Sequence, residues 1–117
     1  IGGHTVSHSR LAIFHGDMQK KEIQEDKARI ETILGKSVTM FAYPFGQSGD
    51  YTNDTVNILD TAGYMQAFTT EGVFAEPRNR FAISRLCIED AQSTSSIGQW
   101  IEGGYDIYHK LKSLCVR

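Results

Sequence analysis

Short apolar runs alternate with amphipathic stretches along this sequence, and this alternation constrains the fold more than any other feature. Residues 38–43 and 65–70 are short, mostly apolar runs, and each follows a stretch whose apolar residues recur at helical spacing. Buried parallel strands have this character because both of their faces are covered. The predicted order of strand, helix, strand, helix, strand, strand and helix indicates an α/β fold with parallel strands and right-handed crossovers.

The first amphipathic stretch predicts a long helix. Asp17 is a suitable N-cap, and Gly35 stands where a left-handed C-terminal residue is usual. Glu25 and Arg29 form a favourable i,i+4 pair on the polar side of this helix. The apolar face is expected to comprise Ile23, Ile30, Ile33 and Leu34.

The remaining segments extend the same pattern. Residues 1–5 are interpreted as the end of a strand, and Thr52 or Asn53 can cap a second helix that stops at Gly63. Residues 71–80 are predicted to form a loop, and the alternating residues 81–88 a last strand. A final helix is expected from the hydroxyl cluster at residues 93–96, with apolar spacing to Leu111 and a break at Gly103-Gly104.

Size and charge exclude several classes of protein. The 117 residues suffice for one domain, and the net charge of -2 provides no basic excess for nucleic acid. No apolar run approaches the ~20 residues that span a bilayer. Cys87 and Cys115 can form one bridge or remain two free thiols. The chain begins without Met or a signal-like segment, in the middle of an expected strand, so we expect either that an upstream part was removed or that the rest of the protein lies elsewhere.

The first motif with chemical potential is His4-Thr5-Val6-Ser7-His8. Neutral imidazoles bind zinc and similar divalent metals well. A spacing of four residues on a turn places both rings on one side, directly after a strand end, where ligand sites of α/β folds lie. The alternative is that His4 and His8 are ordinary polar surface residues.

The second motif is Phe41-Ala42-Tyr43-Pro44-Phe45-Gly46. Pro44 fixes φ and Gly46 permits an unusual φ, so the turn after this strand is expected to be tight. The Phe45 N–H could then stabilise an oxyanion, and Tyr43 and Phe45 offer rings on which a sugar can stack. The alternative is a buried strand that ends at a proline.

In combination, the two motifs and the helix between them resemble the polysaccharide deacetylase family, the metal-dependent carbohydrate esterases that remove N-acetyl groups from sugar polymers. The resemblance continues through residues 61–64, 67–70 and 81–85. It implies a distorted (β/α) barrel, here lacking its first strands, with residues 1–117 as the N-terminally truncated C-terminal portion of the catalytic domain. It also implies an extracytoplasmic location and an N-acetylated, GlcNAc-containing polysaccharide as substrate.

The resemblance assigns roles to particular residues. A divalent metal, usually zinc, would be held by His4, His8 and an aspartate, and it would lower the pKa of a bound water. A second aspartate would act as general base, and the Phe45 N–H would hold the oxyanion. The family's aspartate pair precedes the histidine motif and is absent from this chain, Ala42 replaces a usual arginine, and residues 83–85 stand near the place of a usual Leu-x-His motif.

Other residues of this chain are candidates to replace the absent aspartates, and other functions compete with this scheme. Asp50 is a candidate replacement ligand or a solvated loop carboxylate. His15, which follows the first motif together with Asp17, is expected to be a surface or cap residue rather than a ligand. His109 is expected on a solvated face, whereas Trp100 and Tyr105 are expected in the core. The alternatives are a non-catalytic sugar- or metal-binding module, and a fragment completed by its missing N-terminal segment or by a second chain.

Overall fold

The computed structural model describes residues 1–71, 79–85, 88 and 93–102. The elements in chain order are η1 (Leu11–Ile13), α1 (Gly16–Leu34), β1 (Met40–Ala42), α2 (Asn53–Thr61), β2 (Gln66–Thr69), β3 (Ile83–Ser84) and α3 (Thr94–Ile101). Within the described residues, this order confirms the predicted alternation of helices and strands.

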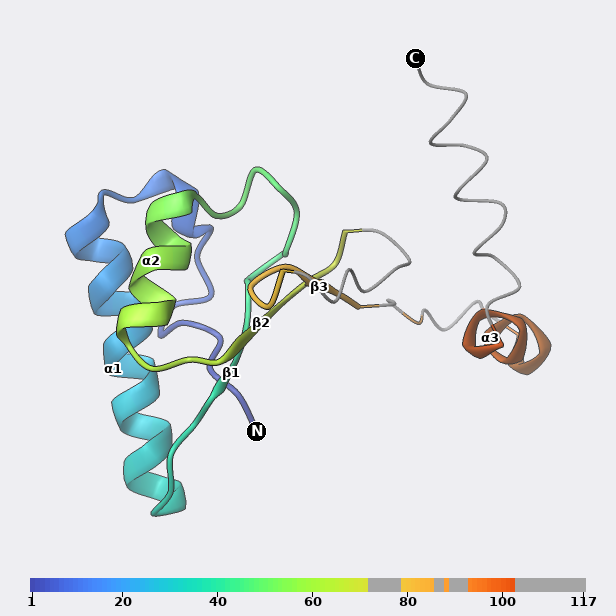
Figure 1. Ribbon diagram of the computed structural model, residues 1–117, viewed down its shortest axis with the longest axis horizontal. Helices are drawn as coiled ribbons and strands as arrows, with labels where there is room; N and C mark the ends of the chain where they lie inside the picture. Colours follow the sequence, from blue (N-terminus) through green and yellow to red (C-terminus); the bar gives the residue numbers. More distant parts are fainter. Residues whose placement is uncertain (72–78, 86–87, 89–92, 103–117) are drawn as a thin grey trace.

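A parallel sheet with the order β1-β2-β3 organises the structure (Figure 1). Gly3 forms an isolated parallel bridge to Phe41 on the outer side of β1, where the Gly3 N–H donates to the Met40 carbonyl at 2.9 Å. Residues 1–5 therefore contribute one bridge rather than a strand. The sheet does not close into a barrel among the described residues, so the structure confirms the α/β class and shows only part of the expected barrel.

Helices α1 and α2 pack against the same side of the sheet (Figure 1). Phe41 of β1 and Ala67 of β2, neighbours in register, are buried in the core. The alternate residues of β1 and β2 lie on the opposite side of the pleat, and Met40 is 40% exposed there. The completely or almost completely buried apolar residues are Leu11, Ile23, Val38, Phe41, Tyr43, Leu59, Tyr64, Ala67 and Phe81.

The predicted ends of both helices are correct to within one or two residues. α1 begins at Gly16 with His15 as N-cap, so Asp17 lies in the first turn rather than at the cap. It ends at Gly35, whose φ of 64° is left-handed as expected. α2 has Thr52 as N-cap, and Thr52 forms a reciprocal capping box with Thr55.

The buried face of α1 differs from the prediction at one position. Ile23 is fully buried and Ile30 and Leu34 pack against the core, but Ile33 is 83% exposed. Gln19 is buried instead, because its amide donates to the Phe14 carbonyl at 2.9 Å and its oxygen accepts the Thr55 hydroxyl. Paired in this way, a polar side chain can replace an apolar one in the helix interface.

The C-terminal part follows the prediction where it is described. β3 comprises two residues of the expected 81–88 strand, and the Ser93 hydroxyl accepts the Ser96 N–H before α3. The interpretations of Cys87, Gly103-Gly104, Tyr105, Tyr108, His109, Leu111 and Cys115 lie outside the described residues, as does the side chain of Trp100. In the described part of the chain, no helix is long and apolar enough to cross a membrane.

Candidate active site

The two histidines of the first motif lie together at the carboxyl-terminal edge of the sheet. The turn that follows Gly3 contains two non-glycine residues with positive φ, Thr5 at 65° and His8 at 54°. This backbone path reverses the chain and brings the imidazole centroids of His4 and His8 to 4.8 Å. The two imidazoles are therefore close enough to contact the same bound ion or molecule.

The orientation of the His4 ring is set by its hydrogen bonds. Its Nδ1 lies 2.7 Å from the Ala42 carbonyl oxygen. A carbonyl can only accept, so Nδ1 carries the hydrogen, and in the neutral imidazole the lone pair is then on Nε2. A ligating histidine usually has such a partner behind it, which fixes both the tautomer and the ring direction. The chemistry of His4 thus fits a divalent metal.

The His4 backbone is held from helix α1. Its N–H donates to Oδ2 of the half-buried Asp26 at 2.7 Å. Burial raises the pKa of the Asp26 carboxyl above its ordinary value, and this N–H opposes the shift by stabilising the carboxylate.

The second motif forms a strained turn beside the histidines. Phe45 has a φ of 62°, and the Gly46 N–H donates back to the Pro44 carbonyl at 2.7 Å. This i→i+2 bond with a positive central φ is the rare form of the three-residue turn. The Phe45 N–H bonds to none of the residues that the structure describes, and the Phe45 ring lies 5.0 Å from that of His8.

Thr70 supports this turn and was not identified as a site residue from the sequence. Its hydroxyl donates to the Phe45 carbonyl at 2.6 Å, and its N–H donates to the Gly46 carbonyl at 2.9 Å. The Gln47 amide donates to the same hydroxyl. Thr70 directly follows β2, which is the neighbour of β1 in the sheet. Parallel strands end at the same edge of a sheet, so the predicted strand order could have indicated that Thr70 lies near the turn after β1.

Tyr43 is a core residue in this structure and not a sugar platform. It is 1% exposed, and its ring stacks on Tyr51 with a centroid distance of 3.9 Å. Its hydroxyl donates to the Phe81 carbonyl at 2.9 Å, and burial raises the pKa of Tyr43. Alternation along β1 explains the difference, since Tyr43 lies on the same side as Phe41. Phe45, at 47% exposed, keeps the ring surface that Tyr43 lacks.

Asp50 is buried in this structure and is not a solvated loop carboxylate. It is 3% exposed, accepts the Gln47 N–H at 2.8 Å and lies 3.4 Å from Nε of Arg10. The guanidinium of Arg10 also lies 4.6 Å from the centroid of Phe45. Asp50 therefore anchors the loop after β1 and the cation beside Phe45. His15 is exposed at the start of α1, where its side chain forms no capping bond.

Among the described residues, the candidate metal ligands are the imidazoles of His4 and His8. Within that part of the chain, no three His, Cys, Asp or Glu side chains are grouped so that they could hold an ion. A hollow of about 220 Å³ adjoins His4 on the side of the sheet away from the helices. It is lined by Ile1, Gly2, Gly3, His4, Met40, Phe41, Ala42 and Phe68.

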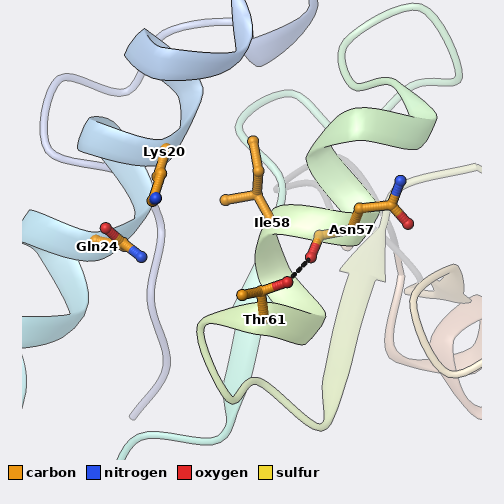
Figure 2. Close-up of a pocket in the computed structure, with 5 residues that line it drawn as sticks. All are labelled: Lys20, Gln24, Asn57, Ile58 and Thr61. Atoms are coloured by element: carbon orange, nitrogen blue, oxygen red, sulfur yellow. Dashed lines mark hydrogen bonds between the residues drawn. The ribbon is translucent and has the colours of Figure 1, made fainter.

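Another hollow lies between the helices, away from both motifs. Figure 2 shows the residues of α1 and α2 that line it: Lys20, Gln24, Asn57, Ile58 and Thr61. The Thr61 hydroxyl is committed to the Asn57 carbonyl of its own helix at 2.8 Å. The hollow contains neither of the paired histidines nor Phe45, so the candidate active site is the edge where those residues meet.

Comparison with known proteins places this arrangement in a family. The parallel sheet is that of an α/β protein, with the imidazole pair at its carboxyl-terminal edge. The family pattern for polysaccharide deacetylase matches residues 1–67, so the chain belongs to the polysaccharide deacetylase family. No curated protein sequence matches the chain.

Several solved structures are similar to this chain. The Streptococcus pyogenes deacetylase PplD, in complex with acetate, has a TM-score of 0.76 at 25% identity and covers 84% of this chain. A polysaccharide deacetylase from Bacillus cereus has a TM-score of 0.72 at 26% identity over 86% of this chain. IcaB from Ammonifex degensii, at 24% identity and a TM-score of 0.60, shares the fold over 73% of this chain.

The matches cover only part of those proteins. This chain spans 42% of the Streptococcus pyogenes chain, 31% of the Bacillus cereus chain and 35% of the Ammonifex degensii chain. The chain thus corresponds to a part of the family's domain, in agreement with the unclosed sheet.

Proposed function

We propose that this chain contributes the histidine pair and the oxyanion donor to the active site of a polysaccharide N-deacetylase. The observation that carries the proposal is the His4 ring, locked by Ala42 with Nε2 available, beside His8 and the Phe45 turn. The substrate would be an N-acetylated, GlcNAc-containing polymer. Family membership and the similarity to deacetylases support this class of reaction, and we propose an extracytoplasmic location for it.

His4 and His8 would hold a divalent metal, with zinc the expected ion. When bound, it supplies a Lewis acid for the acetamide carbonyl and lowers the pKa of water. The His4 Nδ1–H bond to Ala42 keeps that ring from turning away. The carboxylate ligand and the general base of the scheme are proposed to come from outside the described residues.

The Phe45 turn would stabilise the charge that develops during hydrolysis. Addition of water oxygen to the acetamide carbon places negative charge on the carbonyl oxygen. The C–N bond then breaks, the sugar amine leaves with a proton and acetate is released. A fixed N–H aimed at that oxygen costs no reorganisation during the reaction, and one such donor typically contributes ~10²–10³-fold in rate. The exposed Phe45 ring can support the sugar.

The histidine pair can be tested without activity. We expect H4A/H8A to lose the stoichiometric zinc uptake of the wild-type chain, measured by equilibrium dialysis and metal analysis. H15A is the matched control because His15 is exposed and separate from the pair. Unchanged uptake in the double variant would overturn the metal assignment.

Activity of the isolated chain distinguishes the proposal from its competitors. A positioned general base contributes ~10²–10⁴-fold, so without one we expect acetate release from an N-acetylated chitooligosaccharide to be weak. Release that depends on added zinc and is lost in H4A/H8A supports a partial active site. Zinc uptake with no release under any condition favours the non-catalytic metal-binding module. A rate typical of a complete deacetylase would show that a local carboxylate serves as base.

A further inference from the structure

Two carboxylate side chains of helix α1 accept hydrogen bonds from the backbone of residues 4–8, the turn that carries the two histidines. Oδ2 of Asp26 accepts the His4 N–H at 2.7 Å, and Oε2 of Glu22 accepts the Ser7 N–H at 2.9 Å. Glu22 and Asp26 are four residues apart, so they lie on one face of the helix. We propose that Asp26 and Glu22 are positioning residues, which fix the His4–His8 turn in the geometry that directs both imidazoles toward one metal ion.

The turn requires such support because its backbone is unusual. Thr5 and His8 are in the left-handed region, which non-glycine residues rarely adopt unless their surroundings impose it. The two accepted N–H groups belong to His4, immediately before Thr5, and Ser7, immediately before His8. Each carboxylate therefore holds the N–H of the residue that directly precedes one of the two strained residues.

The position of Asp26 is itself closely determined. A Cβ atom on Gly3 would lie 2.9 Å from Asp26 Oδ2 and 2.2 Å from the Tyr64 hydroxyl. The carboxylate thus packs directly against the last residue bridged to the sheet. His4 is then held at two points, at its N–H by Asp26 and at its Nδ1 by the Ala42 carbonyl.

Metal binding makes this positioning measurable. Zinc–nitrogen bonds are about 2.0–2.1 Å long and vary little, so two imidazoles on a loosened turn bind less tightly. Removal of groups that orient metal ligands typically lowers affinity ~10–100-fold. A carboxylate could also attract a cation through its charge alone, without positioning anything. This inference rests on the proposed metal-binding function of His4 and His8.

The experiment titrates the 117-residue chain with Zn²⁺ by isothermal calorimetry. D26A and E22A lose the acceptor, whereas D26N and E22Q lose the charge and keep an oxygen that can accept the same N–H. E25A is the matched control, since Glu25 lies on the same helix and contacts Lys21 and Arg29 instead of the turn. We expect D26A to weaken zinc binding ~10–100-fold, E22A to weaken it less, and D26N, E22Q and E25A to remain near wild type.

Amide hydrogen exchange of the apo chain provides a second readout. D26A should expose the His4 amide and E22A the Ser7 amide, each selectively, while E25A leaves both protected. If D26A does not fold, the comparison of E22A with E22Q and the behaviour of D26N decide the question. Equal losses in D26A and D26N would show an effect of charge and overturn positioning, as would a D26A affinity equal to that of E25A. Absence of zinc binding by the wild-type chain would overturn the proposed function itself.

Discussion

At the scale of single residues, the requirement for glycine at position 3 is a consequence of the site. The backbone of Gly3 bridges to Phe41, and its α-carbon faces the Tyr64 hydroxyl and Asp26. An added methyl group would lie 2.2 Å from the Tyr64 oxygen, a distance that real contacts do not permit. The residue before His4 therefore has to be the smallest one.

We expect Gly3→Ala to lower the free energy of unfolding by about 1–3 kcal/mol, the usual cost of overpacking. It should also disturb the His4 amide, because Asp26 has to move. Urea denaturation measures the first effect and two-dimensional NMR the second. Gly16→Ala is the control, since nothing lies within 4 Å of its added Cβ. Equal stability of the two variants would contradict the close contact at Gly3.

Thr70 offers a residue-scale test of the Phe45 turn. Its hydroxyl bonds to the Phe45 carbonyl, and a net hydrogen bond of this kind contributes about 0.5–1.5 kcal/mol. Thr70→Val should reduce stability by that amount and broaden the amide signals of Phe45 and Gly46. Thr70→Ser retains the hydroxyl and should behave like the wild type. If the turn stayed rigid in Thr70→Val, then Pro44 and Gly46 would be sufficient to fix its conformation without the Thr70 hydroxyl.

At the scale of elements, Glu31 connects the end of α1 to the chain that enters β1. Its carboxylate accepts Lys27 Nζ at 2.6 Å and the Val38 N–H at 2.8 Å. The Lys27 bond first, and the Val38 N–H second, hold the pKa of Glu31 below its ordinary value of 4.5. A lowered pKa in the folded state means that folding favours the ionised form.

The contribution of Glu31 to stability should therefore be complete above pH 4.5 and be lost as the pH falls through its lower folded-state pKa. Urea unfolding across this acid range should show a smaller loss in Glu31→Gln than in the wild type. Glu25→Gln changes a carboxylate of the same helix that only approaches Lys21 and Arg29, at 4.0 and 3.9 Å, and should keep the wild-type profile. An unchanged profile in Glu31→Gln would refute the assignment.

At the scale of the whole molecule, the two sides of the sheet differ in how the described residues cover them. Both α1 and α2 pack on one side, whereas Met40 on the opposite side is 40% exposed and Ile1 at the sheet edge is 82% exposed. Exposed apolar faces and unpaired sheet edges promote association. This arrangement is consistent with a chain that matches only part of the family's domain.

We therefore expect the purified 117-residue chain to self-associate with rising concentration and to bind an apolar dye. Sedimentation velocity measures the first property. Met40→Lys places a charge on the side of the sheet opposite the helices and should reduce association, whereas Ile33→Lys, on the solvent-exposed side of α1, should not. A monodisperse wild-type monomer without dye binding would favour the self-contained binding module.

Local patterns in the sequence determined the elements and the family. Helical spacing, the glycine at position 35 and the capping threonine at position 52 predicted α1 and α2 because these are interactions between near neighbours in the chain. The two motifs likewise predicted His4, His8 and Phe45 as site residues from short spacings. Ile33 shows the limit of such patterns. Its spacing fits the apolar face of the helix, yet its side chain is exposed, because burial also depends on whether another element packs against that turn of the helix.

Only the tertiary structure decided which side chains meet. Tyr43 is buried in the core, where its ring stacks on Tyr51, and the buried Asp50 pairs with Arg10 from another segment. The link from Asp26 to His4 spans 22 residues of sequence, and that from Ala42 to His4 spans 38. Local sequence patterns do not predict these two hydrogen bonds, because the partners meet only when the parallel strands align and helix α1 packs against the sheet. The sequence alone therefore determined the candidate ligands, and tertiary packing determined what orients them.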